Sequence, residues 1–163
     1  MKTRLIAASV TFVAGMAAGV LLSNALPASA SLGGSAMKAQ YLEIVTRDVD
    51  AVVAAYSSAL DLQFSEPDAR LGGARTAPMA GGGLVGIRAP LRDDEDPVVR
   101  PYWLVSDIDA AVAAVVRAGG QIAHPPLEIP GYGTFAIYYQ AGNDHGLWQL
   151  PARGDVGEDA SDE

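Results

Sequence analysis

Two stretches of the chain repeat one order of apolar and polar positions. Residues 39–46 are rich in β-branched and aromatic residues, which is typical of a strand. A helix is predicted to follow and to end near Leu60, because Val52, Val53, Tyr56 and Leu60 recur at the spacing of one helix face. The carboxylate of Asp48 or of Asp50 can cap its first turn.

The same order returns further along the chain. Residues 99–106 predict a strand, and residues 107–118 predict a helix that stops at Gly119-Gly120. When Asp48 is set on Asp107, the sequence VDAVVAA falls on IDAAVAA. This repetition indicates two copies of one structural module.

Shorter strands complete both modules. The first continues with predicted strands at 61–67, 70–80 and 81–90, and the second with strands at 121–124, 134–140 and 145–150. In three segments the apolar residues do not recur at the spacing of a helix or a strand. These segments are the acidic connector 91–99, the Pro/Gly-rich loop 125–133 and the turn 141–144.

We therefore predict an α+β fold built from two βαβββ modules, at about 38–90 and 98–151. Neither module can bury both faces of its sheet alone. Packed edge to edge, the two would form one curved, partly open mixed sheet, with the helices on the outer face. The inner face would then form a cleft for a small molecule.

The two ends of the chain differ from this pattern. Residues 1–30 combine a positive start, an apolar run and the A-x-A spacing of Ala28 and Ala30, which predicts a secretory signal and an exported protein, periplasmic or extracellular. The alternative is an uncleaved membrane anchor, since the apolar run approaches spanning length. We read residues 31–37 as a linker and 152–163 as an acidic, disordered tail.

The composition of the chain excludes several classes of partner and of site. The formal charge is -8 and no basic cluster occurs, which argues against a nucleic-acid partner. The chain has no cysteine, so disulfides, thiolate metal sites and cysteine nucleophiles are excluded.

The pieces GGQIAHPP and GNDHGLWQ, together with the paired modules, resemble the vicinal oxygen chelate (VOC) superfamily, the glyoxalase, bleomycin-resistance and extradiol-dioxygenase group. Members often close with DPxGNxxGLWQ, whereas this chain has Gln140-Ala141 in place of Asp-Pro. The resemblance implies a homodimer as one arrangement. It also implies four metal-ligand positions, which fall here on Tyr41, Gly86, Arg100 and Gly146.

None of these four residues is an ordinary ligand, and a fixed guanidinium repels a cation. A register slip of one residue would bring in Gln40 and His145, but it would turn both away from the cleft. We therefore expect no metal and no other cofactor.

Strand alternation predicts which side chains line the cleft. The aromatic residues would form walls for a planar guest, and Glu43 and Arg100 would be polar anchors or a mutual salt bridge. Tyr132, between two glycines, suits a flap over the cleft or an ordinary turn. The predicted ligand-binding residues are Tyr41, Glu43, Arg100, Tyr102, Tyr132 and Trp148.

Three functions remain open from the sequence. The first is an exported protein that binds a small, partly aromatic molecule without a metal. The second is a glyoxalase-like lyase, isomerase or dioxygenase with an unorthodox site, for which Glu43 and His145 are the catalytic candidates. The third is an interaction domain with a vestigial cleft.

Overall fold

The computed structural model describes residues 36–152, so the predicted signal and the residues of the tail beyond 152 lie outside the described part. The first module contains β1 (Ala39–Val45), α1 (Val49–Leu60), the 3-10 turn η1 (Ala69–Leu71), β2 (Arg75–Pro78) and β3 (Leu84–Arg88). The second contains β4 (Val98–Leu104), α2 (Ile108–Arg117), β5 (Gln121–Ile129), β6 (Gly133–Gln140) and β7 (Asn143–Gln149).

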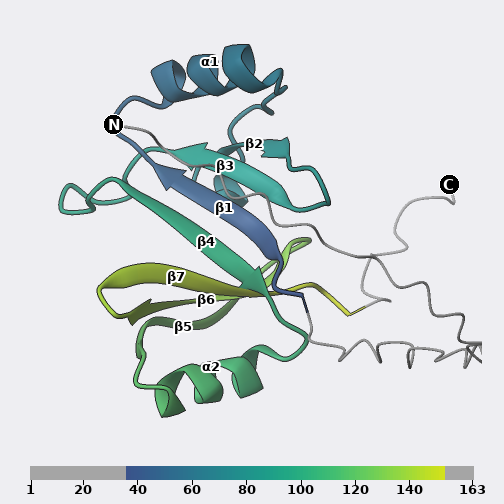
Figure 1. The fold of residues 1–163 in the computed structure, drawn as a ribbon. Coiled ribbons are helices and arrows are strands. Elements are labelled where there is room, and N and C mark those ends of the chain that lie inside the picture. Colours follow the sequence, from purple (N-terminus) through teal and green to yellow (C-terminus); the bar gives the residue numbers. More distant parts are fainter. Residues whose placement is uncertain (1–35, 153–163) are drawn as a thin grey trace, which may run out of the picture. The chain divides into compact units, whose positions relative to one another are not determined.

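The seven strands form a single mixed sheet in the order β2-β3-β1-β4-β7-β6-β5 (Figure 1). Inside each module a parallel pair, β1 with β3 or β4 with β7, repeats the same arrangement. The modules join through the antiparallel pair β1 and β4. The predicted α+β class with a mixed sheet is confirmed.

Both helices begin as the sequence predicts. Asp48 Oδ1 accepts a hydrogen bond from Ala51 N at 3.1 Å, and Asp107 Oδ1 accepts one from Ala110 N at 2.9 Å. These bonds satisfy backbone donors that the first helical turn leaves free. Among residues 36–152, no helix is long and apolar enough to cross a membrane.

The predicted strand at 61–67 is wrong, so the first module is βαββ. Ser65 N donates to Thr76 O at 2.8 Å, but Thr76 N donates to the hydroxyl of Ser65 at 3.0 Å. The Ser65 hydroxyl thus accepts the hydrogen bond from Thr76 N that a backbone carbonyl would accept in a regular pair of strands.

The predicted loop at 125–133 is also wrong in its first half, because β5 continues to Ile129. Pro125 and Pro126 have no N–H to donate, but β5 is an edge strand and needs ladder bonds on one side only. Its register shifts between Ile122 and His124 and again between His124 and Leu127.

The predicted turn at 141–144 is shorter in the structure. Gln140 pairs with Asn143, which leaves Ala141 and Gly142 as a two-residue hairpin loop. Their φ angles of 51° and 80° are those of a type I′ turn. Gln140 and Ala141, which stand where the VOC closing motif often has Asp-Pro, thus lie at a tight hairpin.

The alternation of side chains divides the sheet into two faces. On the outer face, α1 packs over Ile44 and Ile87, and α2 packs over Ala136 and Leu147. The inner face carries a third buried cluster, formed by Tyr41, Leu71, Ala74, Tyr102 and Trp148. Because both α-helices pack on the outer face, the side chains of the inner face are the ones that can form a binding site.

Candidate functional site

A cavity of about 550 Å³ opens on the inner face of the sheet. One side is apolar and comes from β5 and β6, with Leu127, Ile129, Phe135 and Ile137. The floor is ionic and comes from β1, β3 and β4, with Glu43, Arg88 and Arg100. The volume is in the range of small-molecule sites in proteins.

The structure brings together five of the six residues that the sequence assigns to the cleft. Tyr41, Glu43, Arg100, Tyr102 and Trp148 all line the cavity. Their meeting follows from the register of the two central strands, in which Tyr41 pairs with Tyr102 and Glu43 with Arg100. The two modules thus contribute equally to the centre of the site.

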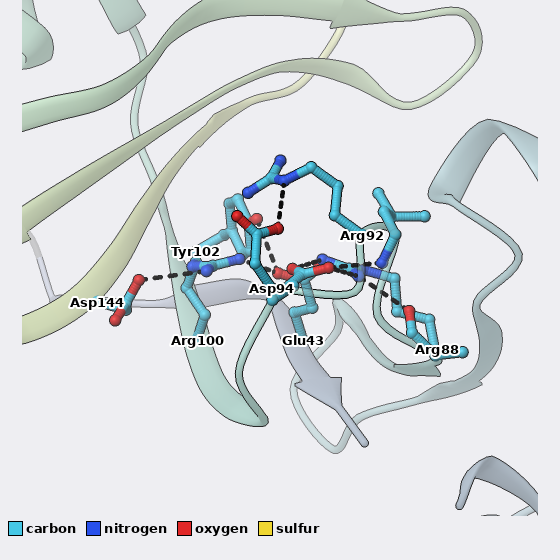
Figure 2. Close-up of polar contacts among 10 residues, drawn as sticks. Glu43, Arg88, Arg92, Asp94, Arg100, Tyr102 and Asp144 are labelled. Carbon is cyan, nitrogen blue, oxygen red and sulfur yellow. Dashed lines mark hydrogen bonds and ion pairs between the residues drawn. The ribbon is translucent and has the colours of Figure 1, made fainter. Parts of the chain in front are cut away.

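Glu43 is the centre of a buried polar cluster (Figure 2). Its carboxylate accepts hydrogen bonds from Arg88 Nε at 2.7 Å, from Tyr102 Oη at 3.0 Å and from Arg100 Nη1. Arg100 Nη2 also contacts Asp144 Oδ1 at 3.2 Å. Glu43, Arg88 and Arg100 are 5–7% exposed, so these charges are neutralised by one another rather than by water. The salt bridge between Glu43 and Arg100, which the sequence allowed as the alternative to two polar ligand anchors, is present.

Arg88 and Glu95 are members of this cluster that sequence reasoning missed. Glu95 Oε1 lies 2.7 Å from Arg88 Nη2, and Glu95 Oε2 lies 2.9 Å from Arg88 Nη1. The hydrogen bonds from Arg88 lower the pKa of the Glu95 carboxyl from its ordinary 4.5 to about 2. The acidic connector is therefore not simply solvated, because one of its carboxylates turns back into the cleft. Glu95, the partner of Arg88, lies in a loop, where the spacing of apolar residues does not predict the direction of a side chain.

Two glycines explain how the tyrosines fit. A side chain at Gly86 would collide with the hydroxyl of Tyr41, and a side chain at Gly146 would collide with the ring of Tyr102. Each tyrosine thus fills the space above a glycine on the neighbouring parallel strand. Burial, followed by the nearby Glu43 carboxylate, raises the pKa of both Tyr41 and Tyr102 well above the ordinary value of 10.0.

The residues at the four family ligand positions do not fit a divalent metal. Two of them are glycines without side-chain donors, and the other two are a buried tyrosine and an arginine that is already paired with carboxylates. The hydroxyl of Tyr41 has no hydrogen-bond partner, but burial keeps it protonated. Within residues 36–152, His, Asp and Glu side chains do not gather into a group that could hold a metal ion.

The aromatic side chains form a continuous cluster along the cavity. The ring of Trp148 lies 5.4 Å from that of Tyr41 and 5.7 Å from that of Tyr102. Phe135 lies on the apolar side and stacks on His124, at 5.2 Å between ring centroids. Phe135 and His124 both line the cavity and were not predicted as site residues. Of the adjacent Tyr138 and Tyr139, Tyr139 lines the cavity and Tyr138 packs under α2.

Tyr132 lies elsewhere than predicted. It lines a smaller neighbouring cavity of about 130 Å³ instead of the main one. Its hydroxyl donates to Asp68 Oδ2 at 2.7 Å, and its carbonyl accepts from Trp148 Nε1 at 3.0 Å. The guanidinium of Arg70 lies 4.8 Å from the centre of its ring. Together with the hydrogen bond from Tyr132 N to Ile129 O at 2.9 Å, these contacts fit the ordinary turn that the sequence allowed as the alternative to a flap.

The two candidate catalytic residues, Glu43 and His145, lie on opposite faces of the sheet. His145 pairs with Tyr138 on the outer face, where the two rings stack at 5.2 Å, so it does not reach the cavity. Glu43 does line the cavity, but three donors already occupy its oxygens. A carboxylate has about four lone-pair sites, so these donors leave about one of them, on Oε1, for a substrate proton.

Comparison with known proteins connects this chain to solved structures only. No protein-family model matches the chain, and no curated protein matches it. A hypothetical protein, BH1468 from Bacillus halodurans C-125, superimposes with a TM-score of 0.58 at 15% identity, covering 74% of this chain and 99% of its own.

Two epimerases are similar in fold as well. Methylmalonyl-CoA epimerase from Mycobacterium tuberculosis gives a TM-score of 0.53 at 18% identity, covering 71% of this chain and 89% of its own. A variant of the Streptomyces coelicolor enzyme in complex with 2-nitronate-propionyl-CoA gives 0.54 at 18% identity, covering 71% and 98%. At these identities the similarity concerns the fold alone. Residues 36–152 therefore have a fold of the vicinal oxygen chelate type.

Proposed function

We propose that this chain is an exported, glyoxalase-like protein of the VOC superfamily that binds a small, partly aromatic molecule in the inner cavity without a metal. The observation that carries this proposal is the composition of the cavity. An apolar side of about four side chains faces a buried ionic floor, at the place where the family positions carry no metal-binding side chain.

This division suits an amphipathic guest. Phe135 and Ile137 offer apolar surface to a planar ring, and the ion-paired guanidinium groups of Arg88 and Arg100 offer a polar surface at the opposite side. We place glyoxalase-like chemistry second, because three donors already hold the Glu43 carboxylate and the positions that the resemblance gives for metal ligands carry no metal-binding side chains. Export rests on residues 1–30 and their signal-like pattern.

The test uses N-phenyl-1-naphthylamine, a neutral aromatic probe whose fluorescence rises in apolar sites. We expect saturable binding and a higher melting temperature, because a ligand that binds only the native state stabilises it. Aromatic metabolites and antibiotics that displace the probe would then identify the natural ligand class. Absence of saturable binding would instead favour the interaction domain with a vestigial cleft.

A matched pair of variants locates the binding site. Leu127 lines the cavity and is 50% exposed, whereas Leu60, on α1, is 59% exposed and lies outside it. Because both side chains are half in solvent, neither substitution empties the core. Leu127→Glu should weaken probe binding by at least about tenfold, since a charge would replace apolar surface. Leu60→Glu should leave binding unchanged, and equal effects of the two variants would contradict the proposed location.

A further inference from the structure

The carboxylate of Glu95 is held by groups that would hold any carboxylate. The Arg88 guanidinium contacts it through Nη1 at 2.9 Å and Nη2 at 2.7 Å, and Leu91 N donates to it at 2.6 Å. A planar fork of two N–H donors is the geometry that proteins use to bind free carboxylates and related anions. Nothing in these contacts depends on the carboxylate belonging to a glutamate of this chain.

Arg88 is positioned independently of Glu95. Its Nε donates to Glu43 at 2.7 Å, and its Nη1 also donates to the carbonyl of Ala89 at 3.0 Å. The side chain is 5% exposed. Because neither contact involves Glu95, the Nη1 and Nη2 side of the guanidinium can be held in position for another anion.

Glu95 reaches this place from the connector between β3 and β4, which forms part of the cavity wall through Leu91, Arg92 and Glu95. The other ion pair of the connector, Arg92 with Asp94, is 75% and 82% exposed and contributes little to holding it. The Glu95 carboxylate is therefore a tethered group at the edge of the cavity, with a local concentration set by a short loop.

We propose that the Arg88 fork is the anion-binding subsite of the cavity and that Glu95 occupies it as an internal competitor. The ligand class is a small molecule with an aromatic body and one carboxylate or sulfonate group. The aromatic body of this ligand rests on the proposed function, whereas the anion subsite depends only on Arg88. A ligand anion displaces the Glu95 carboxylate from Arg88, and the Glu95 side chain then turns away from the cavity.

The first experiment compares two probes that differ by one charged group. 8-Anilino-1-naphthalenesulfonate carries a sulfonate on the ring system of N-phenyl-1-naphthylamine. In Glu95→Ala the sulfonate probe should bind about tenfold more tightly than in the wild type, and the neutral probe should change less than twofold. Asp94→Ala, which removes an exposed carboxylate of the same connector, is the control and should alter neither. Equal gains for both probes, or binding of both probes with no gain for either, would overturn the proposal.

A second experiment needs no aromatic probe. Sodium acetate should raise the melting temperature of Glu95→Ala above its value in sodium chloride of equal ionic strength, and it should leave the wild type and Asp94→Ala unchanged. Acetate stabilisation without neutral-probe binding would retain the Arg88 subsite and refute the aromatic function. Neutral-probe binding without acetate stabilisation and without a gain for the sulfonate probe would refute the subsite and retain the function.

Discussion

The hydroxyl of Tyr41 lies in the space that a side chain at Gly86 would need, and the ring of Tyr102 lies in the same relation to Gly146. Each glycine is on the strand parallel to that of its tyrosine. The two glycines stand at positions where the resemblance to the VOC superfamily implies metal ligands, and large aromatic rings from the central strands fill the space above them.

The first prediction concerns this packing. Gly86→Ala should destabilise the protein by about 1–3 kcal/mol, because the added methyl group meets a tyrosine that is packed against Tyr102 and Trp148. Urea unfolding measures the loss. In the double variant Gly86→Ala/Tyr41→Ala the two costs should not add, since removing the ring removes the collision. Strict additivity would show that the ring does not limit residue 86.

The second prediction concerns the buried charges. Glu43→Gln should cost about 3 kcal/mol or more, because Arg88 and Arg100 would share a neutral amide in a buried site. Glu128→Gln, on an exposed side chain at the cavity rim, should stay within about 0.5 kcal/mol of the wild type. Similar unfolding midpoints for the two variants would contradict the central role of Glu43.

The third prediction concerns pH. The pKa of Glu95 falls from its ordinary 4.5 to about 2 on folding, so the unfolded chain binds more protons between these values. Stability from this pair is therefore complete above about pH 4.5 and declines as the pH falls towards 2. Allowing for solvent screening, the wild type should lose about 1–2 kcal/mol more than Glu95→Gln over this range. The measurement is urea unfolding at several pH values, and Asp94→Asn should follow the wild type.

The fourth prediction separates Tyr132 from ligand binding. Tyr132→Phe removes the hydrogen bond to Asp68 and should cost about 1 kcal/mol of stability. Binding of N-phenyl-1-naphthylamine should not change, because Tyr132 lines the neighbouring cavity. Tyr56→Phe, on a half-buried tyrosine of α1, controls for removal of a hydroxyl. A several-fold loss of affinity in Tyr132→Phe alone would restore Tyr132 to the site.

Local patterns predicted the parts of the fold that depend on local physics. The Asp48 and Asp107 caps, the stop at Gly119 and the two central strands all follow from short-range periodicity and capping. The errors at 61–67 and 125–129 arose where the decision depends on neighbours. A serine hydroxyl replaced a ladder bond in the first case, and an edge position tolerated two prolines in the second.

Strand alternation and the internal repeat were enough to place Tyr41, Glu43, Arg100, Tyr102 and Trp148 around one cavity, because a period of two determines which side chains share a face. Which charges meet there was decided by the tertiary structure alone. The return of Glu95 from an aperiodic connector to Arg88 depends on how the chain closes over the sheet. The position of each tyrosine above a glycine depends in the same way on pairing between strands far apart in the sequence.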